Sequence, residues 1–256
     1  MKSQLLQKSL IIAALLVLAI ASPSHAQTVA VSRSATAPTD NLAFSQTTFT
    51  DLGGGVAAVY SWNNTSGSSF RDIMQSFTPS VGYTLDKVTF QIGGGLYTAS
   101  RAALSGASVN VTLVTLSSNV TSGLTVVPNS SVSLGTGVFP DMTSAATSDY
   151  LTFDVNNTAL TGGTTYGIVL SFVNSASDQA IPLVIKYGTV GSVGGNIYIH
   201  DQNSAANTFT SVSNEYLFYL QSAPSSIPEP SATAMILGLA CGSLVFIRRH
   251  RCRTVQ

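Results

Sequence analysis

The chain has 256 residues and is formally neutral, with 11 basic and 11 acidic residues. Its two cysteines, Cys241 and Cys252, lie near the C-terminus, and His200 is the only histidine between residues 27 and 226, so this interval has no site built from cysteines or several histidines. Five basic and ten acidic residues give the same interval a net charge of −5, which argues against nucleic-acid binding.

Residues 1–26 predict a secretory signal peptide. Two lysines precede an apolar stretch at residues 10–20, and Ser24 and Ala26 place small side chains before Gln27. No cysteine lies near this point, which argues against a lipoprotein route. We expect cleavage after Ala26; a retained N-terminal anchor is the alternative.

Residues 27–39 are rich in Ser, Thr and Ala and predict a flexible lead-in. Residues 40–222 then predict one β-domain, because apolar and polar residues alternate in many short runs that Gly and Asn clusters separate. The alternating runs lie at 88–92, 109–113, 151–155, 166–172, 181–187, 196–200 and 215–220. No part of this region has a sustained helical period, so we expect an antiparallel sandwich or barrel.

Three segments of this region carry a family resemblance. Residues 74–78, 82–90 and 160–170 read MQSFT, GYTLDKVTF and LTGGTTYGIVL. They resemble the choice-of-anchor β-domains of bacterial surface proteins, and are most similar to subgroup R, although Gly167 departs from the usual pattern. The resemblance covers about residues 40–222. It implies a jelly-roll-like antiparallel β-sandwich and assigns no catalytic residue.

The β-region offers little for catalysis. A Ser-His-Asp hydrolase would need His200 as its base, and no Gly-x-Ser-x-Gly elbow accompanies it. Paired carboxylates would be needed for a glycosidase, but Glu215 is the only glutamate and most aspartates adjoin predicted turns. The aspartates interpreted as turn or strand-end residues are Asp51, Asp72, Asp141, Asp149 and Asp178. We therefore expect no catalytic residue and no enzyme activity.

No cofactor or metal site is predicted either. Residues 201–203 and Asp141 offer oxygen ligands of the kind that calcium prefers, but they form no dense ligand loop, so a turn is the favoured interpretation. Trp62 is a candidate glycan contact, because it precedes a polar segment at 63–69. Aromatic residues in sandwiches more often pack in the core, and packing is the favoured role for Trp62.

The C-terminus has three parts. Residues 223–231 form a Pro/Ser linker with the motif Pro228-Glu229-Pro230, and residues 232–247 form an apolar run. As a helix this run spans about 24 Å, less than the hydrocarbon core of about 30 Å. The tail, residues 248–256, contains Arg248, Arg249, Arg251 and Arg253. We expect a short transmembrane helix with its basic tail in the cytoplasm.

This arrangement resembles the PEP-CTERM sorting signal of Gram-negative bacteria. The resemblance implies processing by an exosortase-type membrane enzyme, transient residence in the inner membrane, and delivery to the cell surface or extracellular matrix, often with exopolysaccharide and biofilm. An ordinary permanent anchor is the alternative. The sequence thus favours a structural surface or matrix protein, with a carbohydrate-binding module as the alternative and an extracellular hydrolase third.

Overall fold

The structure is a computed structural model that describes residues 27–47, 59–65, 69–93, 102–118, 125–146, 148–173, 179–187, 195–201, 208–212 and 214–224. The chain divides into two units, 1–223 and 224–256, and every described residue except Pro224 belongs to the first. The predicted signal peptide, Pro-Glu-Pro motif, transmembrane helix and basic tail all lie outside the described residues. Within the described ranges, no helix is long and apolar enough to span a membrane.

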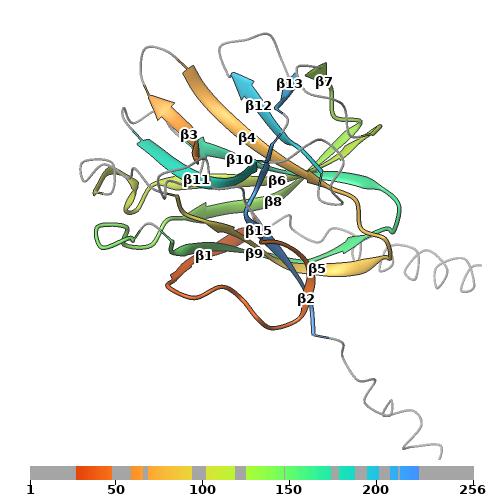
Figure 1. Cartoon of the computed structure of the whole chain (residues 1–256), viewed down its shortest axis with the longest axis horizontal. Helices are drawn as coiled ribbons and strands as arrows, with labels where there is room; N and C mark the ends of the chain where they lie inside the picture. Colours follow the sequence, from red (N-terminus) through yellow and green to blue (C-terminus); the bar gives the residue numbers. More distant parts are fainter. Residues whose placement is uncertain are drawn as a thin grey trace, which may run out of the picture. The chain divides into compact units, whose positions relative to one another are not determined.

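The described residues contain fifteen strands and one helical turn at 102–104, which confirms the prediction of an all-β fold (Figure 1). The strands are β1 (Thr28–Ser34), β2 (Leu42–Gln46), β3 (Val59–Thr65), β4 (Ser69–Phe77), β5 (Tyr83–Gln91), β6 (Ser108–Leu116), β7 (Thr125–Val126), β8 (Ser130–Val138), β9 (Tyr150–Leu160), β10 (Thr165–Val173), β11 (Gln179–Tyr187), β12 (Ile197–Asp201), β13 (Phe209–Val212), β14 (Asn214–Tyr216) and β15 (Phe218–Ser222). Each predicted alternating run overlaps a strand, and the last run, 215–220, covers β14 and β15.

Twelve of the fifteen strands form one continuous path, in the order β14-β11-β3-β4-β10-β6-β8-β1-β9-β5-β15-β2. The other three branch from β4: β12 pairs with β4, β13 with β12, and β7 with β13. The pairs are antiparallel except at β1, whose first residues pair in parallel with β8 while Ala30–Ser34 pair antiparallel with β9. The prediction of a purely antiparallel arrangement is therefore corrected to a mixed sheet. Figure 1 shows β9, β5 and β15 in one layer and β10, β6 and β8 in the other, with β1 joining them.

The main hydrophobic core lies between these two layers. Its buried side chains come from both, including Phe90 and Phe153 from the β5–β9 layer and Leu113 and Leu170 from the β6–β10 layer. Phe139, just after β8, bridges the layers: its ring centroid lies 6.4 Å from that of Phe153 and 5.9 Å from that of Phe172.

The predicted flexible lead-in is wrong for residues 28–34, which form β1. Val29 is 1% exposed in the main core, and Arg33 Nη1 lies 2.7 Å from Asp149 Oδ2. Pairing with β8 and β9 overrides the weak strand preference of Ser and Ala in this segment. The β-domain therefore begins about twelve residues earlier than the sequence-based boundary at residue 40.

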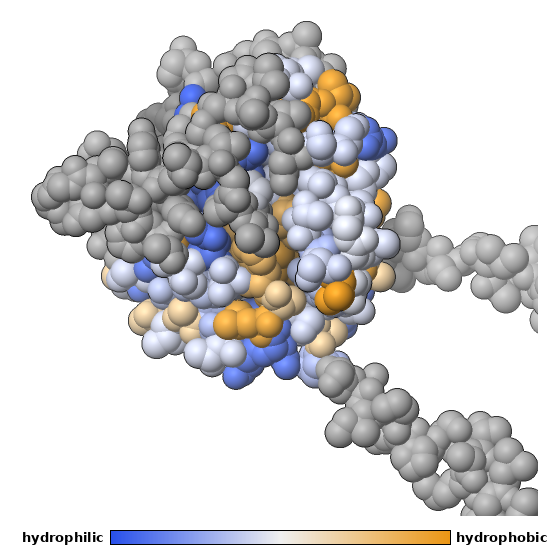
Figure 2. Space-filling view, turned by 45° about the vertical axis from the view of Figure 1, so that its right-hand side comes forward, coloured by the Kyte–Doolittle hydropathy of each residue, from blue (hydrophilic) through white to orange (hydrophobic). Residues whose placement is uncertain are grey.

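Apolar surface is limited on the described part of the domain. Five large apolar residues there are well exposed: Leu42, Val81, Val127, Val132 and Val138. Figure 2 shows apolar side chains in small groups among polar ones over the coloured residues of the face that it presents. Single exposed apolar residues are ordinary in folded proteins and need no partner to explain them.

Candidate functional site

A polar pocket lies against the outer face of the β4–β10–β6 layer, on the side away from the main core. Alternation along each strand creates this second face: on β4, Ile73 belongs to the main core while Met74 belongs to a second cluster, and on β10 the same holds for Leu170 and Val169. The second cluster, called here the outer-face cluster, comprises Met74, Val114, Leu116, Val169, Tyr198 and Phe209.

The sheet curls over this face. Only residues 127–129 connect β7 to β8, so at 3.8 Å per residue step the two strands lie within about 15 Å of each other. Yet six pairings separate them along the path β7-β13-β12-β4-β10-β6-β8, which in a flat sheet would span roughly 28 Å. The strands must therefore bend, and Phe209 of β13 packs with Val114 and Val169 in the outer-face cluster.

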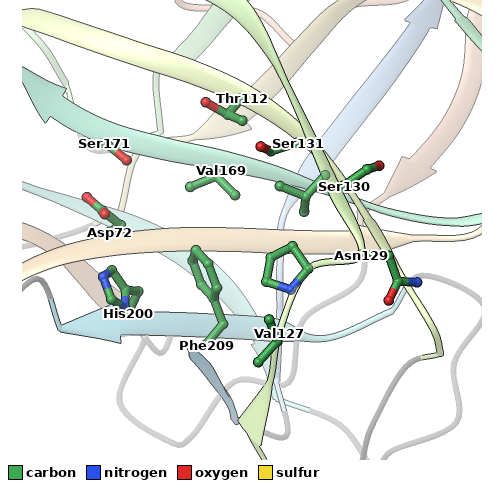
Figure 3. A pocket seen from close by; sticks show the side chains of 12 residues that line it. Asp72, Thr112, Val127, Asn129, Ser130, Ser131, Val169, Ser171, His200 and Phe209 are labelled. Atoms are coloured by element: carbon green, nitrogen blue, oxygen red, sulfur yellow. The ribbon is translucent and has the colours of Figure 1, made fainter. Parts of the chain in front are cut away.

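The pocket has a volume of about 390 Å³ and lies between the curled strands and the layer beneath (Figure 3). Polar and apolar side chains both line it. The polar ones are Asp72, Thr112, Asn129, Ser130, Ser131, Ser171 and His200, and the apolar ones are Val114, Val127, Pro128, Val169 and Phe209. No lysine or arginine is among these twelve residues.

Asp72 and His200 form a cross-strand pair at one end of the pocket. They are opposite each other in the antiparallel register of β4 and β12, and Figure 3 shows their side chains next to one another. Asp72 is 8% exposed, so its carboxylate lies largely out of bulk water. The pocket thus holds one acidic group and one imidazole in a partly apolar setting.

A backbone contact assigns the proton on His200. Its Nδ1 atom lies 2.9 Å from the Thr208 carbonyl oxygen. A carbonyl oxygen can only accept, so Nδ1 carries the hydrogen and donates it. In the neutral ring Nε2 is then an acceptor. The ring also contacts Phe209, with centroids 5.3 Å apart, which fixes its orientation from a second side.

The opposite end of the pocket is built where β7 turns into β8. The Asn129 amide N–H donates to the Thr115 carbonyl at 2.8 Å, and Ser117 Oγ donates to Asn129 Oδ1 at 3.0 Å. The hydroxyls of Thr115 and Ser130 are 2.7 Å apart and hydrogen-bonded. These contacts hold the residue 127–130 segment against β6 at the edge of the pocket.

The arrangement differs from that of a Ser-His-Asp triad. In a triad the aspartate accepts the Nδ1 hydrogen and Nε2 faces the serine. Here the Thr208 carbonyl takes the Nδ1 hydrogen, so Asp72 does not have the orienting role. The geometry fits hydrogen bonding to a ligand better than activation of a nucleophile.

Two of the predicted turn aspartates are turn residues. Asp149 Oδ2 accepts from the Ala146 amide at 3.0 Å, and Asp141 Oδ1 accepts from the Thr143 amide at 2.9 Å. Hydrogen bonds from the Thr143 hydroxyl and amide hold the pKa of Asp141 below its usual value. Asp72 contradicts the prediction, since it lies within β4; Asp51 and Asp178 lie outside the described residues.

The structure describes few of the other predicted site residues. Trp62 is in β3, opposite Ile181 of β11, and its side chain is outside the described part of the structure. The segment expected to be a polar loop after Trp62 instead continues β3 to Thr65, while Ser69 already belongs to β4. Ala26, the motif at 228–230 and the four terminal arginines are outside the described residues. Among the described residues, no group of three or more His, Cys, Asp or Glu side chains is placed to hold a metal ion.

Comparison with known proteins gives no assignment. No family model matches the chain, and no curated protein matches it. Among solved structures, the cysteine protease and lectin-like domains of Cwp84, a surface layer associated protein of Clostridium difficile, align at 16% identity and a TM-score of 0.36, over 64% of this chain and 36% of that one. A second structure, clostridial Cwp84 after propeptide cleavage, aligns at 17% identity and a TM-score of 0.36, over 66% and 41%. The chain spans less than half of either structure, and similarity at this level assigns no function.

Proposed function

We propose that the chain is an exported structural protein of the cell surface or extracellular matrix, sorted by its C-terminal segment through an exosortase-type enzyme. The observation that supports this most is where the β-domain begins and ends. Its first strand starts at Thr28, two residues after the expected cleavage point, and its last strand ends at Ser222, before the Pro-Glu-Pro motif. In this proposal the residues before Thr28 and after Ser222 carry the two address signals.

The β-domain is the cargo in this proposal. Its two layers and single main core are compatible with a jelly-roll-like sandwich, with β1 as the parallel exception. We infer no catalytic role, because the His200–Thr208 contact removes the one Asp-His pair of the pocket from triad geometry. A carbohydrate-binding role is the second candidate, and the mixed lining of the pocket favours it over the third, an extracellular hydrolase.

Glu229→Ala should leave export intact and cause uncut precursor to accumulate in the inner membrane. The reason is that Pro228 and Pro230 keep this segment extended outside the membrane, while the arginines stall translocation and present it to the processing enzyme. Intact-mass analysis of surface and membrane fractions from the native host measures the result. The unaltered chain should yield a product from Gln27 to near Pro230.

Ser225→Ala is the matched control, since it changes the same linker outside the motif and should be processed normally. A mature surface product that retains Arg248–Arg253 would contradict the proposal and indicate a permanent anchor. Normal processing of Glu229→Ala would contradict the role given to the motif.

A further inference from the structure

We propose that the pocket bounded by Asp72, His200, Phe209 and the residue 127–131 segment binds a neutral sugar unit of a polysaccharide. This inference rests on the proposed function only for the source of the sugar, which would be a surface or matrix polysaccharide.

The polar groups match the hydroxyls of a sugar. A sugar hydroxyl donates one hydrogen bond and accepts others, so it needs both kinds of partner. Asp72 has a carboxylate that accepts hydrogen bonds, and His200 presents Nε2 because Nδ1 is committed to Thr208; Nε2 accepts in the neutral ring and donates in the imidazolium. The hydroxyls of Thr112, Ser131 and Ser171 can donate or accept.

The apolar groups match the carbon-bound hydrogens of a sugar ring. Phe209, Val169 and Val127 lie among the polar groups in the pocket lining (Figure 3). Small-molecule sites have volumes of about 300–1,000 Å³ and polar groups that fix the orientation of the ligand; the lining of this pocket, with seven polar and five apolar residues, is more polar than usual. At about 390 Å³, this pocket is at the small end of that range, which suits a ligand of one or two rings.

The charge of the lining selects against anions. None of the twelve described residues that line the pocket is a lysine or an arginine, so none of them supplies the cation that usually pairs with a phosphate, sulfate or uronate group. Asp72 adds a negative charge that would repel such groups. The expected order of binding is therefore neutral sugar ahead of acidic sugar, with the methyl glycoside of a hexose or N-acetylhexosamine as the simplest ligand.

A purely structural role for the Asp72–His200 pair makes a different prediction. Cross-strand pairs stabilise sheets, so a structural pair would affect the melting temperature and leave sugar binding absent. The two roles are separated by measuring binding and thermal stability on the same variants.

The test is ligand-observed NMR on the full chain, purified in mild detergent. The probes are methyl glycosides of glucose, galactose, mannose and N-acetylglucosamine, with glucuronic acid as the acidic comparison, each at millimolar concentration. At least one neutral glycoside should show saturation transfer, and more strongly than glucuronic acid. Absence of transfer from every neutral probe would overturn the proposal, as would a preference for glucuronic acid.

Variants locate the binding in the pocket. Asp72→Asn keeps the side-chain shape and should lower the affinity for the glycoside at least tenfold. Asp86→Asn, which changes an aspartate of β5 outside the pocket lining, should bind as the unaltered chain does. Ser171→Ala removes one hydroxyl from the half-buried wall and should weaken binding severalfold, so the test remains decisive if Asp72→Asn fails to fold. Unchanged binding in both pocket variants would overturn the site.

Other outcomes distinguish failure of the sugar site from failure of the proposed function. Cleavage of the glycosides during the NMR experiment would overturn a binding role in favour of a hydrolase. Binding in vitro together with failure of C-terminal processing in the host would contradict the proposed sorting route while leaving the sugar site intact. Normal processing without sugar binding would do the reverse.

Discussion

Removal of residues 27–34 should unfold the β-domain. The measurement compares residues 27–224 with residues 35–224 by circular dichroism and thermal melting. The longer chain should show β-type spectra and one cooperative transition that is insensitive to reductant, because residues 27–224 contain no cysteine. The shorter chain should show no cooperative transition.

The reason is the position of β1 between the two layers. Without it, β8 and β9 lose their common neighbour and expose unpaired backbone groups at two edges. Arg33 also ties β1 to the segment before β9, through Asp149 at 2.7 Å and Ser144 Oγ at 2.8 Å. A typical domain is stable by only about 5–15 kcal/mol, so losing a whole internal strand should exceed what remains.

β1 packs closely against β8. A Cβ added at Gly137 of β8 would lie 2.8 Å from the Val29 carbonyl oxygen, nearer than a real contact allows. Point variants therefore give a second test. Val29→Asp places a charge in the core and should abolish the cooperative melt, whereas Ser32→Asp, on the exposed side of the same strand, should change it little. A cooperative melt for residues 35–224 would refute the assigned role of β1.

The strands that alternation predicts are those in which apolar residues occupy every second position. β5, β6, β9 and β10 are of this kind, since most of their inward residues are Val, Leu, Ile or Phe and each strand contains a run with a period of 2. β1 and β8 were harder to predict, because Ser, Ala, Thr and Gly dilute their apolar positions. Their strand conformation comes from pairing with residues far along the chain, which local sequence does not encode.

The pocket, like the fold, could be predicted from the sequence only in part. The sequence identifies His200 as the only histidine available for a site between residues 27 and 226. The sequence does not predict that Asp72 and His200 lie opposite each other, because this depends on the register between β4 and β12. The sequence also predicts a turn or strand end at Asp72, which in the structure lies within β4. The curl that encloses the pocket is visible only when the short β7–β8 link is compared with the strand order.

Phe139→Ala should lower the free energy of unfolding by about 3–5 kcal/mol, as expected when a fully buried aromatic side chain is truncated. Phe139 is 2% exposed and contacts Phe153 of one layer and Phe172 of the other, so its loss leaves a cavity between the layers. The neighbouring aromatic rings are held by their own strands and cannot collapse far into that space. Urea unfolding of residues 27–224 measures the change.

The neighbour Val138 supplies the control. It is 55% exposed at the end of β8, and Val138→Ala should change stability by less than about 0.5 kcal/mol. The slope of unfolding free energy against urea should stay the same in both variants if only the packing between the layers is altered. A loss below about 1 kcal/mol for Phe139→Ala would mean that the two layers are held together elsewhere, with β1 the first candidate. A loss of the predicted size, together with unfolding on removal of β1, would show that two features hold the layers together. β1 does so by pairing with a strand of each layer, and Phe139 does so by packing between them.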